Sequence, residues 1–270
     1  MLPHYSPLKV AETFGMLAAL SPGRIDLGLG RAAGTDSTTT FALQRDRRQA
    51  SPDDFPQQLV ELLAHLTRSL PPEHPFARLT ALHGNPERPE PWLLGSSPQS
   101  AVWAAELGLP YAFADFINPD GEAIMARYRQ EFEPSAALAA PRGIVAIWAL
   151  CAETQAEAER LAASSRMAFA LFFRGQFIAV PPVETALTFL ETEPVDPLAA
   201  IRRRRSIVGD PDNVAKGIRA VAREYGVDEV MVVTITHDHA ARRRSYELLA
   251  EAFGLSSAGR TAQTLEPARG

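Results

Sequence analysis

The chain has 270 residues, 46% of them hydrophobic, and a formal net charge of −5 at pH 7. This length allows one or two domains with a full hydrophobic core. The negative charge gives no general attraction to nucleic acid or to an anionic membrane, and we expect neither as a partner. No apolar run is long enough to cross a bilayer, and the N-terminus lacks a signal-peptide pattern. With Cys151 as the one cysteine no intrachain disulfide can form, and we expect a cytoplasmic protein.

The first predicted elements are a helix and a strand. Ser6 and Pro7 form an N-cap and first-turn pair, and the apolar residues that follow at helical spacing predict a helix. Residues 24–30 (RIDLGLG) predict a strand with its leucines on one face and Gly28 and Gly30 on the other. Glycines on one face of a strand leave room for another group to approach closely.

The next segment alternates between irregular and helical patterns. Residues 31–49 are polar and rich in threonine, which predicts a loop. Leucines at helical spacing predict a helix over residues 52–67. Residues 69–91 contain six prolines, so we expect irregular structure with a short hairpin about residues 77–82.

A short buried strand is predicted over residues 92–94, ending at Gly95. Ser97 and Pro98 then begin a helix as its N-cap and first residue. Three hydroxyl side chains accompany the amide groups of its first turn: Ser96, Ser97 and Ser100. A helix N-terminus of this kind is a site for a phosphate or another small anion. A well-capped turn that binds nothing explains the pattern equally well.

The rest of the chain continues the alternation of strands and helices. Strands are predicted over 111–116, 143–150 and 229–235, and helices over 121–132, 154–167, near 184–190, from Asp210-Pro211 to Gly226, and from Asp238 to 253. This order predicts an α/β fold with a parallel sheet wrapped by helices. Five strands are predicted, whereas a (β/α)₈ barrel needs eight. The chain is therefore either an open five-stranded sheet or a barrel that lacks its opening.

Four segments together resemble the bacterial luciferase-like flavin monooxygenases. They are residues 2–12 (LPHYSPLKVAE), 22–31 (PGRIDLGLGR), 94–97 (LGSS) with 104–110 (AAELGLP), and 208–214 (VGDPDNV). The resemblance implies a TIM barrel that lacks its first three strands. Either a truncated gene model or a decayed copy of the gene would explain the missing strands. It implies one domain over 1–255 and a flexible tail over 256–270.

The resemblance also implies an activity and its cofactor. The chain would use FMN, reduced by a flavin reductase or by NAD(P)H, to oxidise a small organic substrate with O₂. A reductase and a second copy of the chain are candidate partners. Two alternatives stay open: a deazaflavin-dependent enzyme that transfers hydride on the same fold, and a non-catalytic remnant that acts only with a partner chain.

The cofactor site follows from the resemblance position by position. It places the FMN phosphate at Ser96, Ser97 and Ser100, beside Gly95, although the best-known members have a carboxylate where Ser96 stands. Arg31 would pair with the same phosphate, since a guanidinium can bond two of its oxygens. His4 would lie near the flavin ring, or it is a polar loop residue. No catalytic acid or base is assigned.

Several other motifs have ordinary structural explanations. In His237-Asp238-His239 the aspartate suits an N-cap, and we expect no metal. Gly28, Gly30 and Gly34 do not have the dinucleotide-binding spacing. Residues 202–205 are four arginines, which either reach the phosphates of a nicotinamide cofactor or form a solvated surface run. The three arginines at 242–244 are predicted to lie on the outer face of the last helix. Cys151 is predicted to be inert packing. The functional prediction therefore centres on the Ser97 turn.

Overall fold

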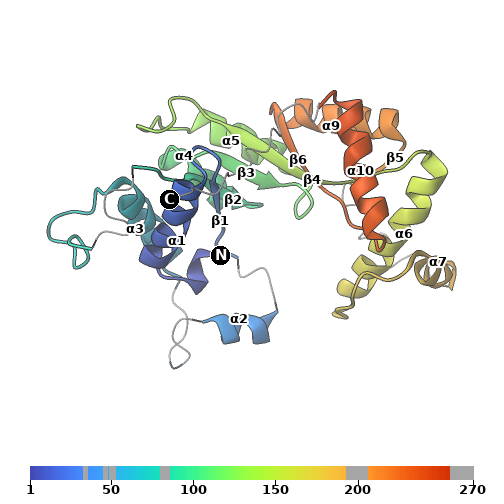
Figure 1. Cartoon of the computed structure of the whole chain (residues 1–270), viewed down its shortest axis with the longest axis horizontal. Coiled ribbons are helices and arrows are strands. Elements are labelled where there is room, and N and C mark those ends of the chain that lie inside the picture. Colours follow the sequence, from blue (N-terminus) through green and yellow to red (C-terminus); the bar gives the residue numbers. More distant parts are fainter. Residues whose placement is uncertain (33–35, 45–47, 49–52, 80–85, 193–205, 256–270) are drawn as a thin grey trace, which may run out of the picture. The chain divides into compact units, whose positions relative to one another are not determined.

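The computed structural model describes residues 1–32, 36–44, 48, 53–79, 86–192 and 206–255. The chain divides into two compact units, which are described separately (Figure 1). The N-terminal unit comprises Met1–Ala114 and Asp120–Val145, and the C-terminal unit comprises Asp115–Pro119 and Ala146–Gly270. The single domain over 1–255 stays a prediction.

The N-terminal unit alternates helices and parallel strands. Its elements are η1 (Leu2–His4), α1 (Pro7–Leu20), β1 (Asp26–Leu29), α2 (Ser37–Leu43), α3 (Phe55–Thr67), β2 (Glu90–Gly95), α4 (Pro98–Glu106), β3 (Tyr111–Ala114), α5 (Glu122–Gln130) and the start of β4 (Gly143–Cys151). Strands β1, β2 and β3 pair in parallel, with Leu29 opposite Leu93 and Gly95 opposite Phe113. Parallel pairing brings the carboxyl ends of these strands to one edge.

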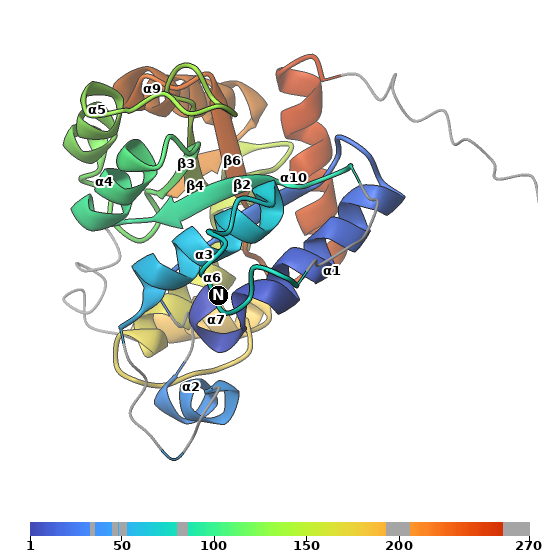
Figure 2. The ribbon, with the colours of Figure 1, turned by 90° about the vertical axis from the view of Figure 1, so that its left-hand side faces the viewer.

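One face of these strands forms the core of the unit. Its side chains are at most 2% exposed: Leu27, Leu29, Leu93, Tyr111 and Phe113. Helix α4 packs against β2, and α1 lies alongside α3 (Figure 2). The opposite face carries Gly28 and Leu94, which are exposed. The predicted alternation of β1 is thus confirmed, and on its glycine face the Leu94 side chain approaches Gly28, 3.0 Å from where a Cβ would stand.

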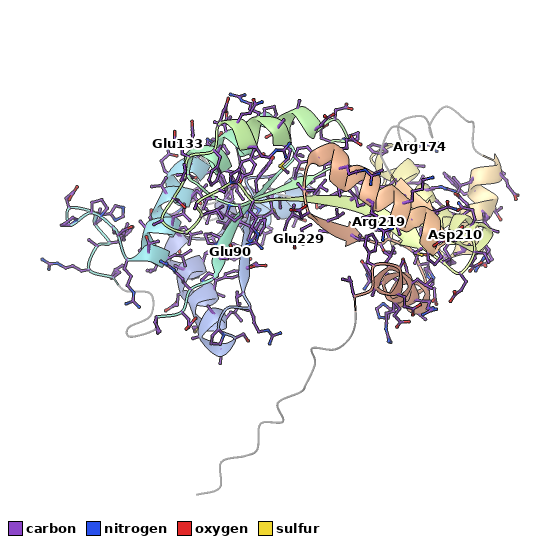
Figure 3. The ribbon with its side chains drawn as sticks, turned by 90° about the horizontal axis from the view of Figure 1, so that it is seen from above. Glu90, Glu133, Arg174, Asp210, Arg219 and Glu229 are labelled. Atoms are coloured by element: carbon purple, nitrogen blue, oxygen red, sulfur yellow. The ribbon has the colours of Figure 1, made fainter. Side chains whose placement is uncertain are left out.

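The C-terminal unit continues the same alternation. It contains most of β4, then α6 (Gln155–Phe172), α7 (Val183–Thr192), β5 (Ser206–Gly209), α9 (Pro211–Tyr225), β6 (Glu229–Val233) and α10 (His239–Ala252). Strand β4 pairs in parallel with β5 and also pairs with β6. Arg219 of α9 (Figure 3) lies over the Phe253 ring at the end of α10, 4.7 Å from the ring centroid.

The predicted helix starts are confirmed by their caps. Ser6 accepts a hydrogen bond from the Lys9 amide, Asp210 from Asn213 and Asp238 from Ala241. Gly226 ends α9 in the left-handed conformation, with φ of 60°. These signals are local, since a side chain satisfies an amide three residues away. Local sequence therefore sets these boundaries.

Three predictions about elements were wrong. The segment 31–49 was predicted to be a loop, but it contains α2, which Asp36 caps through the Thr39 amide and hydroxyl. Strand β5 was missed, since its residues do not alternate between buried and exposed. Helix α6 continues five residues beyond its predicted end at 167. The hairpin predicted about 77–82 falls partly on residues 80–85, and these, 202–205 and the tail 256–270 lie outside the described residues.

Within the part of the chain that the structure describes, the helices are too short or too polar to span a bilayer.

Candidate functional site

The turn between β2 and α4 has the predicted form. Strand β2 ends at Gly95, and Ser97 is the N-cap of α4 with Pro98 in its first turn. The Ser97 side chain makes no capping hydrogen bond and is exposed. Its hydroxyl therefore does not cover the first-turn amides, where the helix dipole favours negative charge. Ser96 is half-buried at the strand end.

The Ser100 hydroxyl lies beneath this turn. It donates to the Ser97 carbonyl oxygen at 2.7 Å and lies 2.9 Å from the Tyr111 hydroxyl, and Ser100 is only 7% exposed. A Cβ at Gly95 would stand 2.1 Å from its Oγ. Only glycine fits there while Ser100 keeps this position. Ser100 as a phosphate ligand stays a prediction, and its hydroxyl already has three protein partners, the third being the Ser97 hydroxyl at 3.5 Å.

Arg31 reaches the same edge of the sheet by strand register. Because Leu29 lies opposite Leu93, Arg31 follows β1 at the level of Gly95. Its guanidinium forms two hydrogen bonds to Asp53, from Nε at 3.1 Å and Nη2 at 2.6 Å, and lies 5.8 Å from the Trp103 ring of α4. Both charged side chains are at least half exposed, and such a pair contributes only about 0–1 kcal/mol. An anion could therefore compete with Asp53 for Arg31.

No pattern in the amino-acid sequence indicated that Asp53 would be a partner for Arg31. The two residues are 22 positions apart, and Asp53 immediately precedes the Asp54 N-cap of α3. Neither the periodicity of hydrophobic residues nor the spacing of a motif can predict a contact between residues this far apart in the chain. Only the placement of α3 brings them together.

His4 lies in η1, which contacts α3. Its Nε2 atom is buried and has no hydrogen-bond partner among the described residues. A buried imidazole nitrogen without a partner is costly, so this atom fits a position that a bound group completes. The role predicted for His4 stays a prediction.

A cavity of about 270 Å³ lies elsewhere in the N-terminal unit. Its lining includes Gly15 of α1, His65 of α3 and Arg88, and none of the six predicted cofactor residues. The His65 Nε2 atom lies 3.6 Å from Glu61, and burial lowers the pKa of this imidazole against the opposing effect of Glu61. The cavity is thus separate from the Ser97 turn.

The motifs of the C-terminal unit have structural roles. Asp238 caps α10, as predicted. Of the last arginines, Arg242 and Arg243 are exposed, whereas Arg244 pairs with Glu153 at 2.8 Å and Glu251 at 3.1 Å. The arginines 202–205 lie outside the described residues.

Cys151 is 1% exposed at the end of β4. Burial, with smaller contributions from Asp210 and Glu153, raises the pKa of its thiol to about 11. At pH 8 only about 0.1% would be thiolate, the reactive form. We therefore expect a chromogenic disulfide reagent to leave the folded protein unlabelled for hours and to label one thiol per chain in urea. Rapid labelling of the folded chain would contradict this prediction.

Comparison with known proteins gives the family. The family model for luciferase-like monooxygenases matches residues 1–229. The uncharacterized protein YwcH of Bacillus subtilis (strain 168) is 42% identical over 257 residues, which cover 94% of this chain and 76% of the relative. N-acetyl-S-alkylcysteine monooxygenase of the same organism is 33% identical, over 93% of this chain and 75% of its own length.

A solved structure shows the same fold at similar identity. The crystal structure of apo-MsnO8 superposes with a TM-score of 0.84 at 41% identity, over 95% of this chain and 75% of that one. The α/β class and the TIM-barrel relationship predicted from the sequence are confirmed by these neighbours. The chain belongs to the luciferase-like monooxygenase family, a family of oxidoreductase enzymes.

Proposed function

We propose that the chain is an FMN-dependent monooxygenase that binds the flavin phosphate at the turn between β2 and α4 and oxidises a small organic substrate with O₂. The observation that carries this proposal is the N-terminus of α4, whose N-cap hydroxyl, on Ser97, makes no capping bond. Unsatisfied first-turn amides and the helix dipole together favour a phosphate.

The surrounding residues fit a phosphate ester at this position. Strand register brings Arg31 to the level of Gly95, and its exposed bond to Asp53 is weak enough for a phosphate dianion to displace. His4, whose buried Nε2 has no hydrogen-bond partner in the described part of the chain, would offer a hydrogen-bonding group near the flavin ring rather than at the phosphate. These residues all belong to the N-terminal unit.

When bound, the reduced flavin supplies the reaction with O₂, and the chain's own residues hold and orient it. Ser97 and the α4 amides fix the phosphate end, and Arg31 balances its charge. Reduced FMN would come from a flavin reductase or from NAD(P)H. The family relative that acts on N-acetyl-S-alkylcysteine supports a small organic substrate.

The proposal is tested by comparing FMN with riboflavin, which lacks the phosphate. Charge-assisted hydrogen bonds contribute about 1.5–3 kcal/mol, so we expect FMN to bind at least about tenfold more tightly than riboflavin. Titrations followed by flavin fluorescence give both dissociation constants, in the oxidised form and after anaerobic reduction. Equal affinities would overturn the phosphate site.

A second measurement addresses the chemistry. The chain with reduced FMN is expected to consume O₂ in proportion to the substrate oxidised. Turnover with a reduced deazaflavin and no oxygen uptake would instead establish hydride transfer and contradict the monooxygenase proposal.

A further inference from the structure

Two buried hydroxyl groups meet beneath the turn that begins α4. The Tyr111 hydroxyl, from the start of β3, lies 2.9 Å from the Ser100 hydroxyl of α4. Tyr111 is fully buried, and its ring packs against those of Phe113 and Tyr128, with centroids 6.2 Å and 5.4 Å away. The tyrosine is therefore held firmly from the core side.

The direction of these hydrogen bonds follows from the donors available. The one hydroxyl proton of Ser100 is directed to the Ser97 carbonyl oxygen at 2.7 Å. Tyr111 must then donate its own proton to the Ser100 Oγ. Burial raises the pKa of Tyr111 to about 12, so this donor keeps its proton at neutral pH. The chain of bonds runs from Tyr111 through Ser100 to the Ser97 carbonyl.

Gly95, at the end of β2, lies beside the Ser100 hydroxyl that Tyr111 contacts. A Cβ on Gly95 would lie 2.1 Å from the Ser100 Oγ and 2.4 Å from its Cβ. Glycine at the end of β2 therefore lets Ser100 pack directly against the strand. Residues of β2, α4 and β3 thus lock the turn that carries Ser97.

We propose that Tyr111 and Ser100 are positioning residues of the phosphate site and that Ser100 is not itself a phosphate ligand. The pair holds the Ser97 carbonyl on the inner side of the turn and so fixes the direction of the first-turn amides of α4. This inference rests on the proposed function, because it concerns the same phosphate. It revises the ligand role that the resemblance implies for Ser100.

The proposal is tested with Tyr111→Phe and Ser100→Ala, measuring the dissociation constants of FMN and riboflavin for the full chain. Each variant is expected to weaken FMN binding about fivefold to tenfold and to leave riboflavin binding unchanged, since only the phosphate amides lose their alignment. The double variant is expected to lose no more than Ser100→Ala alone, because Tyr111 acts only through Ser100. If Ser100 bound phosphate directly, Ser100→Ala would weaken FMN binding while Tyr111→Phe left it unchanged.

Tyr128→Phe is the matched control, since it removes a buried tyrosine hydroxyl from the same aromatic group without touching Ser100. It is expected to keep the FMN-to-riboflavin ratio of the original chain. The two proposals can fail independently. If the unmodified chain binds FMN and riboflavin equally well, the phosphate site is overturned. If the unmodified chain prefers FMN and Tyr111→Phe has the same ratio of FMN to riboflavin affinity, the positioning role is overturned.

Discussion

Replacing Ser97 with aspartate is expected to weaken FMN binding by about 100-fold while leaving α4 at least as stable. Aspartate is a strong N-cap, and its carboxylate would accept hydrogen bonds from the same first-turn amides that the phosphate needs. It would also repel the phosphate dianion. Two like-charged groups about 5 Å apart interact by about 3 kcal/mol at the dielectric of a protein surface, which corresponds to about 100-fold in affinity.

The matched control is Ser97→Asn. Asparagine has nearly the same shape as aspartate and is an equally good N-cap, but it carries no charge. Both variants are expected to bind riboflavin as the original chain does. The asparagine variant is expected to lose much less FMN affinity than the aspartate variant, since it competes for the amides but does not repel the phosphate. Measuring both flavins at low and high salt separates charge from shape, since repulsion weakens with salt. If the two variants bound FMN equally, the phosphate would not lie at the α4 N-terminus.

The parts of the fold that could be predicted are those whose signals lie within a few residues. Ser6, Asp210 and Asp238 each satisfy an amide three residues ahead, and the alternation of strand β1 repeats every second residue. Such patterns survive without knowledge of tertiary structure. Strand β5 lacks such an alternation and is defined by its pairing with β4, which no local pattern indicates.

The candidate site divides in the same way. The Ser97 turn was predicted because strand, glycine, cap and proline are consecutive in the chain. The contact between Ser100 and Tyr111 depends on the packing of α4 over β2 and β3, and the bond from Arg31 to Asp53 depends on where α3 begins. Residue types alone therefore suggested which side chains could bind phosphate, but not which of them already had partners.

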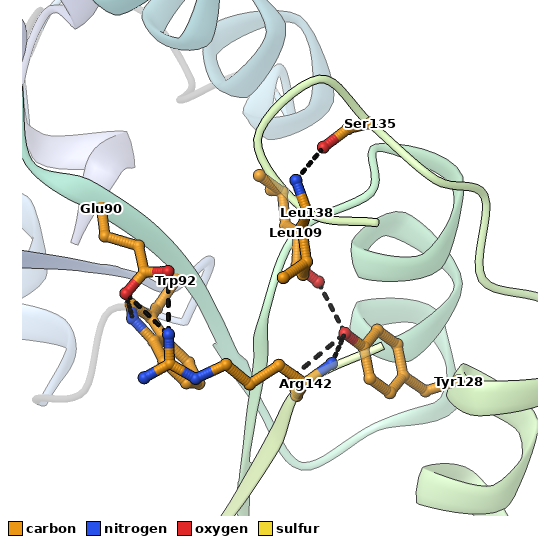
Figure 4. Close-up of polar contacts among 7 residues, drawn as sticks. All are labelled: Glu90, Trp92, Leu109, Tyr128, Ser135, Leu138 and Arg142. Carbon is orange, nitrogen blue, oxygen red and sulfur yellow. Dashed lines mark hydrogen bonds and ion pairs between the residues drawn. The ribbon is translucent and has the colours of Figure 1, made fainter. Parts of the chain in front are cut away.

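A second polar cluster in the N-terminal unit shows how burial decides the value of a hydrogen bond (Figure 4). The Arg142 guanidinium bonds both carboxylate oxygens of Glu90, at 2.9 and 3.0 Å, and lies 4.7 Å from the centroid of the Trp92 ring. On the other side, the Tyr128 hydroxyl reaches the Leu109 carbonyl at 2.8 Å and the backbone of Arg142. The ion pair is 40–47% exposed, whereas Tyr128 is 1% exposed.

Tyr128→Phe is therefore expected to lower the free energy of unfolding by about 2 kcal/mol, because it leaves buried backbone groups of Leu109 and Arg142 without this partner. Glu90→Gln, which removes the exposed ion pair of the same cluster, is expected to cost at most about 1 kcal/mol. Urea unfolding followed by tryptophan fluorescence, with both variants at the same pH, measures the two costs. A larger loss in Glu90→Gln than in Tyr128→Phe would mean that the ion pair stacked on Trp92, and not the buried hydroxyl, holds this part of the unit together.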